Sequence, residues 1–191
     1  MLYKVLKVIV RPVLKILTLY KIENMPENIP SGRVIICANH KSLIDPFFLI
    51  MGFKRQIKFI AKKELFKFKP LGCFLKTVGT FPVDRKNNDI DAVKKSIEIL
   101  KNEDVLGIFP EGTRIKTKQE IKRENFNNGI AMIALRGNSD IIPVEIIGKI
   151  GFFTRPKIIF KDIIHIDKFK NLPKKEIYST IVDEVFNKIY N

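Results

Sequence analysis

Residues 33–46, RVIICANHKSLIDP, are the most informative stretch of the chain. Residues 33–38 form an apolar run rich in β-branched side chains, which is typical of a buried strand. A short polar turn follows, and Asp45 then precedes Pro46. An acidic residue before a proline favours a helix start, so we expect Asp45 to be the N-cap and Pro46 the first helical residue. A buried strand that turns directly into a helix is typical of an α/β sheet.

The same alternation continues along the chain. Further strands are expected at residues 57–61, 78–83, 105–109, 141–147 and 157–166. Helices are expected from Asn88 or Asp89 through Leu100, and over residues 126–136 and 174–190. The sequence therefore predicts an α/β fold, in which a mixed, largely parallel β-sheet is covered by helices within a single domain.

Length, charge and cysteine content restrict the kind of protein. A chain of 191 residues suits one compact domain. Its 35 Lys and Arg residues against 20 Asp and Glu residues, a net charge of +15, predict an anionic partner. Cys37 and Cys73 match neither a disulfide framework nor a zinc-ligand spacing, and no secretory leader is evident. We therefore expect an intracellular protein without a metal site.

Residues 2–20 have the pattern of an amphipathic helix. At ~100° per residue, Lys4, Lys7, Arg11 and Lys15 share an arc of ~80°. Opposite them lies an apolar arc of Leu2, Val5, Leu6, Ile9, Val13, Ile16, Leu17 and Tyr20. No stretch offers the ~20 apolar residues that a membrane span needs. Residues 1–24 are therefore predicted to lie on an anionic bilayer, followed by the α/β domain over 25–191. The alternative is a helix docked on the domain's own core. Pro12 is expected to kink this helix or to open a second one.

Polar residues follow the first predicted strand. His40 precedes Asp45 by five residues, close enough for the carboxylate to reach the imidazole ring. A carboxylate in that position fixes the tautomer of a histidine and stabilises its protonated form. A neutral imidazole can accept a proton near pH 7. This pair predicts a general base, although a surface histidine beside a helix cap has the same spacing.

Two further segments follow predicted strands. One runs from Gly79 to Asp84 and Arg85, and the other comprises residues 109–114, Phe-Pro-Glu-Gly-Thr-Arg. Gly112 permits close approach of a ligand to the backbone. The guanidinium groups of Arg85 and Arg114 have the planar shape that matches phosphate oxygens. These segments predict a phosphate-binding region.

Taken together and in order, these segments resemble the glycerolipid acyltransferase family, typified by lysophosphatidate acyltransferases. The family's four motifs match Asn39, His40 and Asp45; Gly79, Asp84 and Arg85; Phe109 to Arg114; and Ile141-Ile142-Pro143-Val144. The similarity covers roughly residues 22–147. Ile115 and Asn127 depart from it, because the family often has serine and lysine at these positions.

The resemblance implies that the protein transfers an acyl group from acyl-carrier protein or acyl-CoA to the sn-2 hydroxyl of 1-acyl-glycerol-3-phosphate. His40 would act as general base and Asp45 would orient it. The acceptor would be held by Arg85, Glu111, Gly112, Thr113 and Arg114, and Asn39, Gly79, Asp84, Pro110 and Pro143 would support the site. The thioester is a co-substrate, and neither metal nor organic cofactor is expected. The implied location is peripheral, at the cytoplasmic face of the cell membrane.

Two alternatives remain. Because Ile115 and Asn127 flank the phosphate-binding region, the acceptor could instead be glycerol-3-phosphate or another lysophospholipid. A second alternative is a non-catalytic basic protein that binds membrane or nucleic acid. Nucleic-acid binding favours exposed aromatic residues among basic ones. The phenylalanines here lie mostly inside apolar runs, so we expect no nucleic-acid partner.

Overall fold

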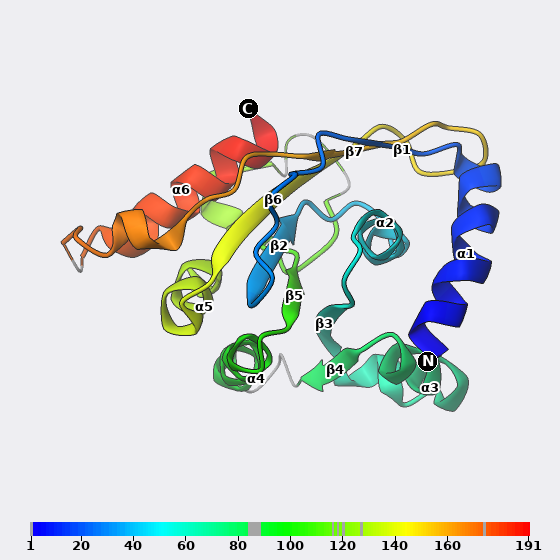
Figure 1. Cartoon of the computed structure of the whole chain (residues 1–191), viewed down its shortest axis with the longest axis horizontal. Coiled ribbons are helices and arrows are strands. Elements are labelled where there is room, and N and C mark those ends of the chain that lie inside the picture. Colours follow the sequence, from blue (N-terminus) through cyan, green and yellow to red (C-terminus); the bar gives the residue numbers. More distant parts are fainter. Residues whose placement is uncertain are drawn as a thin grey trace.

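The computed structural model describes residues 2–83, 89–115, 117, 119, 121–126, 128–173 and 175–191. One sheet runs through this part of the chain (Figure 1). Its seven described strands are β1 (Lys21–Glu23), β2 (Val34–Ala38), β3 (Ile57–Lys62), β4 (Thr80–Val83), β5 (Val105–Ile108), β6 (Asp140–Ile147) and β7 (Lys157–Phe160). They lie in the order β1-β7-β6-β2-β5-β3-β4. Only the β6–β7 pair is antiparallel, so the predicted mixed, largely parallel sheet is confirmed.

Helices cover both faces of the sheet (Figure 1). The helices are α1 (Leu2–Thr18), α2 (Asp45–Gly52), α3 (Lys69–Thr77), α4 (Asp89–Lys101), α5 (Gly129–Gly137) and α6 (Ile177–Tyr190), with short 3₁₀ turns at η1 (Lys63–Phe66), η3 (Arg123–Asn125) and η4 (Ile166–Phe169). One apolar core joins α1 and α2 to the sheet, through Leu14 and Phe48 among others. A second core joins α4, α5 and α6 to the opposite face, through Leu100, Ala134 and Val185 among others.

Most of the expected elements form within a few residues of their predicted bounds. The strand expected at 157–166 is wrong in its second half, because β7 ends at Phe160 and only Ile164 returns to pair with Ile141. The N–H of Ile166 is accepted by the Asp140 carboxylate at 2.9 Å rather than by a strand. The helices expected from residues 126 and 174 begin later, at Gly129 and Ile177. No expectation covered α3 or the short edge strand β1.

Helix α1 is continuous, with Pro12 inside it, so the alternative of two separate helices is wrong. Leu14 is buried against the core, and Tyr3 and Val10 pack beside it. Ile9, Val13 and Ile16 of the predicted apolar arc are exposed to solvent instead. The side-chain ammonium of Lys7 donates to the carbonyl of Phe53 and that of Lys15 to the carbonyl of Tyr20. The helix therefore docks on the domain's own core, as in the alternative, but it does so through Tyr3, Val10 and Leu14. Of the described members of the apolar arc, Tyr20 is buried and most of the others face solvent.

Candidate active site

The ends of β2 and β5 bring the first and third motifs together. These strands are parallel neighbours, so their carboxyl ends lie at the same edge of the sheet, where open α/β sheets place their ligands. His40 follows β2, and residues 109–114 follow β5. The backbone N–H of Ile115 donates to the carbonyl oxygen of His40 at 2.7 Å. The ring of Phe109 stacks on that of His40, with 4.3 Å between centroids and 25° between planes. The sequence placed Phe109 in the motif, but gave no signal for this stacking.

The His40–Asp45 pair forms as the sequence predicts. The Nδ1 atom of His40 lies 2.9 Å from Oδ2 of Asp45. The same carboxylate oxygen accepts the backbone N–H groups of Lys41 at 2.6 Å and Ser42 at 2.7 Å. Asp45 is fully buried, whereas the His40 side chain is 18% exposed. The turn thus wraps around a buried carboxylate that faces one nitrogen of a partly accessible imidazole.

Asp45 is not the N-cap of α2, and this expectation is wrong. Ile44 holds the cap position, and Asp45 is the first residue of the helix, with Pro46 after it. The Asp45 carboxylate turns back to the amides that precede it, because those of Lys41 and Ser42 are within reach and His40 offers a third partner. The Asp45 carboxylate therefore orients the imidazole of His40 and does not cap the helix, although an Asp-Pro sequence favours capping.

This geometry leaves one ring nitrogen of His40 able to accept a proton. With Nδ1 donating to a buried carboxylate, the lone pair of His40 lies on Nε2. A proton accepted at Nε2 creates an imidazolium whose charge Asp45 stabilises directly. The pair is arranged to take a proton from a substrate hydroxyl or thiol. Burial raises the pKa of the neighbouring Cys37 thiol well above its ordinary value of 9.0, so Cys37 is a poor candidate nucleophile.

Asn39 and Pro143 hold strands together. The Asn39 side-chain amide donates to the carbonyl of Ile146 at 3.0 Å, and its oxygen accepts the N–H of Ile146 at 2.6 Å. Pro143 is buried on β6, in register with Cys37 of β2. Both residues thus fix β6 beside the strand that carries His40.

The loop after β5 presents polar groups to solvent. Gly112 has φ of +66°, and a Cβ there would meet no atom within 4 Å, so a ligand could approach its Cα closely. Its N–H donates to the carbonyl of Phe109 at 3.1 Å. Thr113 and Arg114 are exposed, while Pro110 and Ile115 are buried and anchor the loop. Asp84, Arg85 and Asn127 lie outside the described residues. Gly79, with φ of +82°, forms the turn into β4, where a Cβ would meet the Gln56 side chain at 2.9 Å.

Glu111 points away from solvent. Its Oε1 accepts a hydrogen bond from the Tyr190 hydroxyl at 2.6 Å, at the end of α6. Burial raises the pKa of Glu111 from 4.5 to about 7, and the nearby Asp45 charge adds to this, while the Tyr190 hydrogen bond and the backbone amides of Glu111 and His40 oppose it. No pattern in the sequence pointed to Tyr190, which is 79 residues away along the chain.

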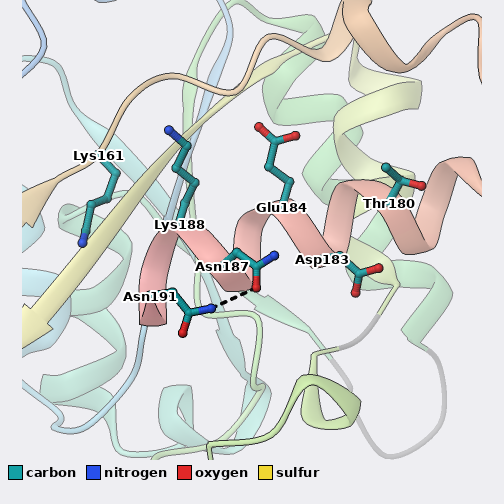
Figure 2. Close-up of a pocket in the computed structure, with 7 residues that line it drawn as sticks. All are labelled: Lys161, Thr180, Asp183, Glu184, Asn187, Lys188 and Asn191. Carbon is teal, nitrogen blue, oxygen red and sulfur yellow. Dashed lines mark hydrogen bonds between the residues drawn. The ribbon is translucent and has the colours of Figure 1, made fainter.

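A cavity of about 850 Å³ adjoins the same loop between α4 and α5. Its apolar walls include Ile60, Val93, Ile97, Leu106, Ile108, Ile130 and Ile133, and its basic residues are Lys62, Lys94 and Arg136. Phe109, Gly112 and Thr113 line it at the loop. The volume is in the range of ligand-binding pockets. A second, polar groove runs along the outer side of α6 and contains none of the predicted site residues (Figure 2).

Comparison with known proteins agrees with this geometry. The Acyltransferase family model matches residues 17–147. The chain is 34% identical over 176 residues to the 1-acyl-sn-glycerol-3-phosphate acyltransferase of Bacillus subtilis, and the aligned region covers 89% of this chain and 84% of the relative. It is 35% identical over 162 residues to the Saccharomyces cerevisiae enzyme of the same name, and that alignment covers 79% of this chain and 52% of the relative.

A solved structure supports the fold. The crystal structure of the 1-acyl-sn-glycerophosphate acyltransferase from Thermotoga maritima superposes with a TM-score of 0.72 at 22% identity, covering 97% of this chain and 77% of that one. At this identity the similarity concerns the fold. The family match spans most of the chain and includes the His40–Asp45 turn and the 109–114 loop. The chain therefore belongs to the acyltransferase family.

Proposed function

We propose that this protein transfers an acyl group from an acyl thioester to the sn-2 hydroxyl of 1-acyl-glycerol-3-phosphate, making phosphatidic acid for phospholipid biosynthesis. The observation that carries this proposal is the His40–Asp45 pair, stacked on Phe109 at the start of the exposed 109–114 loop. The Bacillus subtilis relative, of which the chain covers 84%, carries this activity in its name.

The chemistry follows from the free nitrogen of His40. Nε2 accepts the proton of the acceptor hydroxyl as its oxygen attacks the thioester carbonyl carbon. The carbon–sulfur bond then breaks, and the proton on His40 passes to the leaving thiolate. General-base catalysis of this kind contributes typically ~10²–10⁴ in rate, and positioning of the two substrates adds to it. The thioester is already activated, so we propose no metal or organic cofactor.

The loop and the cavity suit the two ends of 1-acyl-glycerol-3-phosphate, its phosphate and its acyl chain. Arg114 and Thr113 would bind the acceptor phosphate and glycerol, together with Arg85, and Gly112 would let the acceptor approach the loop closely. The cavity beside the loop combines apolar walls with Lys62, Lys94 and Arg136, which fits a ligand with an acyl chain and an anionic head. Glu111 also lines this cavity, and its carboxylate is held by the Tyr190 hydroxyl.

Thiol release tests the proposed reaction. Release from acyl-CoA and from acyl-carrier protein would be measured in detergent micelles, with lysophosphatidate, glycerol-3-phosphate, a lysophospholipid with a larger headgroup, or no acceptor. We expect release that depends on lysophosphatidate. Thiol release that depends on another acceptor instead would change the assigned substrate. No thiol release with any donor and acceptor would favour a non-catalytic binding protein.

We further propose that the protein is a peripheral protein on an anionic bilayer. No helix in the described part of the chain is long and apolar enough to cross a membrane. Instead, Ile9, Val13 and Ile16 of α1 are exposed, and so are Phe152 and Phe153 of the β6–β7 turn, by 75% and 66%. The N–H of Phe153 donates to the carbonyl of Leu17 at 2.6 Å, which ties this turn to the end of α1 (Figure 1). Exposed apolar side chains on a helix and on the turn attached to its end, in a basic protein, fit a lipid surface.

Substitution of these exposed residues tests the membrane surface without removing Leu14 or Tyr20 from the core. The combined variant Ile9→Ser, Ile16→Ser, Phe152→Ser and Phe153→Ser is expected to bind vesicles containing anionic lipid at least about tenfold more weakly, because it loses apolar area that enters the bilayer. Co-sedimentation measures this. Ile90→Ser on α4 is the matched control, since Ile90 is 61% exposed on the other face of the sheet. Equal loss of binding in the control would exclude this surface.

A further inference from the structure

We propose that Tyr190, the last residue of α6, is a positioning residue that holds the Glu111 carboxylate and thereby orders the acceptor loop at Gly112, Thr113 and Arg114. The proposal rests on the proposed function, because it concerns the loop that would bind the acceptor. It assigns a role in the site to the C-terminal helix, which lies outside the family match at residues 17–147.

The contact is specific. The Tyr190 hydroxyl donates to Oε1 of Glu111 at 2.6 Å. The other carboxylate oxygen, Oε2, is buried and makes no hydrogen bond within the described part of the chain. Tyr190 is thus the side-chain donor that binds a carboxylate directly preceding Gly112. A buried carboxylate with a single side-chain donor depends on that donor, because without it only the backbone amides of Glu111 and His40 favour the charged form and burial favours the protonated one.

The position of the hydroxyl is set by the packing of α6. Ile181, Val182, Val185 and Ile189 bury one side of the helix in the core. The Tyr190 ring contacts Phe186 at 5.2 Å and Phe126 at 6.0 Å between centroids. On the outer side of the helix, polar residues line the groove (Figure 2), and Lys188 also pairs with the exposed Asp162 at 2.8 Å. The apolar packing near the end of the helix therefore presents the hydroxyl to Glu111 at a defined place.

The electrostatic surroundings give this contact a pH signature. Asp45 from α2 and the Cys37 thiol from β2 interact with Glu111, and Glu145 from β6 interacts with Tyr190. Burial raises the pKa of Glu111 to about 7, and the Tyr190 hydrogen bond lowers it by favouring the charged form. Burial and the Glu111 charge raise the pKa of Tyr190, so its hydroxyl stays a donor through the neutral range. Removing that hydroxyl leaves Glu111 protonated to a higher pH.

Tyr190→Phe keeps the ring and its packing but removes the donor. Loss of a hydrogen bond to a charged group moves the acidic limb of the kcat/KM profile for the acceptor upward by about one pH unit. Activity near pH 7 is then expected to fall about fivefold and to recover above about pH 8.5. Tyr178→Phe, at the other end of α6, is the matched control and should follow the wild-type profile. A uniform loss at every pH, or an unshifted limb, would overturn the proposal.

A second readout does not depend on turnover. The Glu111 carboxyl resonance, identified by its absence in Glu111→Gln, would be titrated by carbon-13 NMR in wild type and in Tyr190→Phe. The variant is expected to titrate at the higher pH. Identical titration would disprove the positioning role even if the enzyme assay works. A shifted titration without acceptor-dependent thiol release would uphold the contact and reject the proposed function instead.

Discussion

Replacing His40 by alanine is expected to lower kcat by at least about 10²–10⁴ while the fold persists, because the general base is lost. The His40 ring pairs with Asp45 and stacks on Phe109, and it lies at the edge of the sheet rather than in either core. The backbone bond from Ile115 to the His40 carbonyl does not involve the side chain. Acceptor-dependent thiol release measures the loss, and circular dichroism with thermal unfolding measures the fold.

The chain supplies its own control for this experiment. His165 forms a similar pair, with Nδ1 2.8 Å from Oδ2 of Asp140, but its side chain is 68% exposed and it follows β7 rather than β2. His165→Ala should therefore leave turnover near the wild-type value. Wild-type turnover in His40→Ala would remove His40 from the reaction. An equal loss in both variants would mean that the effect arises from the fold.

Asp45→Asn is expected to lower kcat by about 10–10², because the charge that stabilises the imidazolium of His40 is lost. The N–H groups of Lys41 and Ser42 and the Nδ1 atom of His40 all bind the same oxygen, Oδ2. An asparagine oxygen at that position keeps these three contacts, and the amide group takes the place of Oδ1. The imidazole keeps its orientation, but the proton that Nε2 accepts is no longer balanced by a carboxylate.

The comparison with Asp45→Ala separates the loss of the charge from the loss of the hydrogen bonds that hold the turn. Alanine leaves the N–H groups of Lys41 and Ser42 without their acceptor, at a cost of about 1–3 kcal/mol for each buried group. Thermal unfolding should therefore show a large loss of stability for Asp45→Ala and a small one for Asp45→Asn. Asp140→Asn is the control for turnover. An Asp45→Asn variant with wild-type kcat would show that Asp45 has only a structural role.

Features set by local spacing could be predicted well. The strand at 34–38 and the turn after it follow from a short run of residues, and so does the approach of Asp45 to His40, five positions apart. The expectation that Asp45 caps α2 was wrong although the sequence pattern favours it, because a carboxylate can bind any donor within reach. Here it binds the backbone N–H groups of Lys41 and Ser42 and the imidazole of His40 instead of the N–H groups of the helix.

Features that depend on packing between distant segments could not be predicted. The amphipathic arcs of α1 are plain in the sequence, yet the helix docks through Tyr3, Val10 and Leu14 and leaves Ile9 and Ile16 exposed. A helical wheel gives the angular positions of side chains but not which sector meets the core. The rotation is set by the shape and polar groups of the surface it covers.

The sequence by itself determined the α/β class, the order of the motifs and the pairing of His40 with Asp45. These depend on periodicity and on contacts between near neighbours, which a short segment encodes almost alone. Only the tertiary structure decided that β7 runs antiparallel to β6, that Phe109 stacks on His40 and that Tyr190 reaches Glu111. These contacts join segments far apart in the chain, and their geometry is the joint result of how the two cores pack against the sheet.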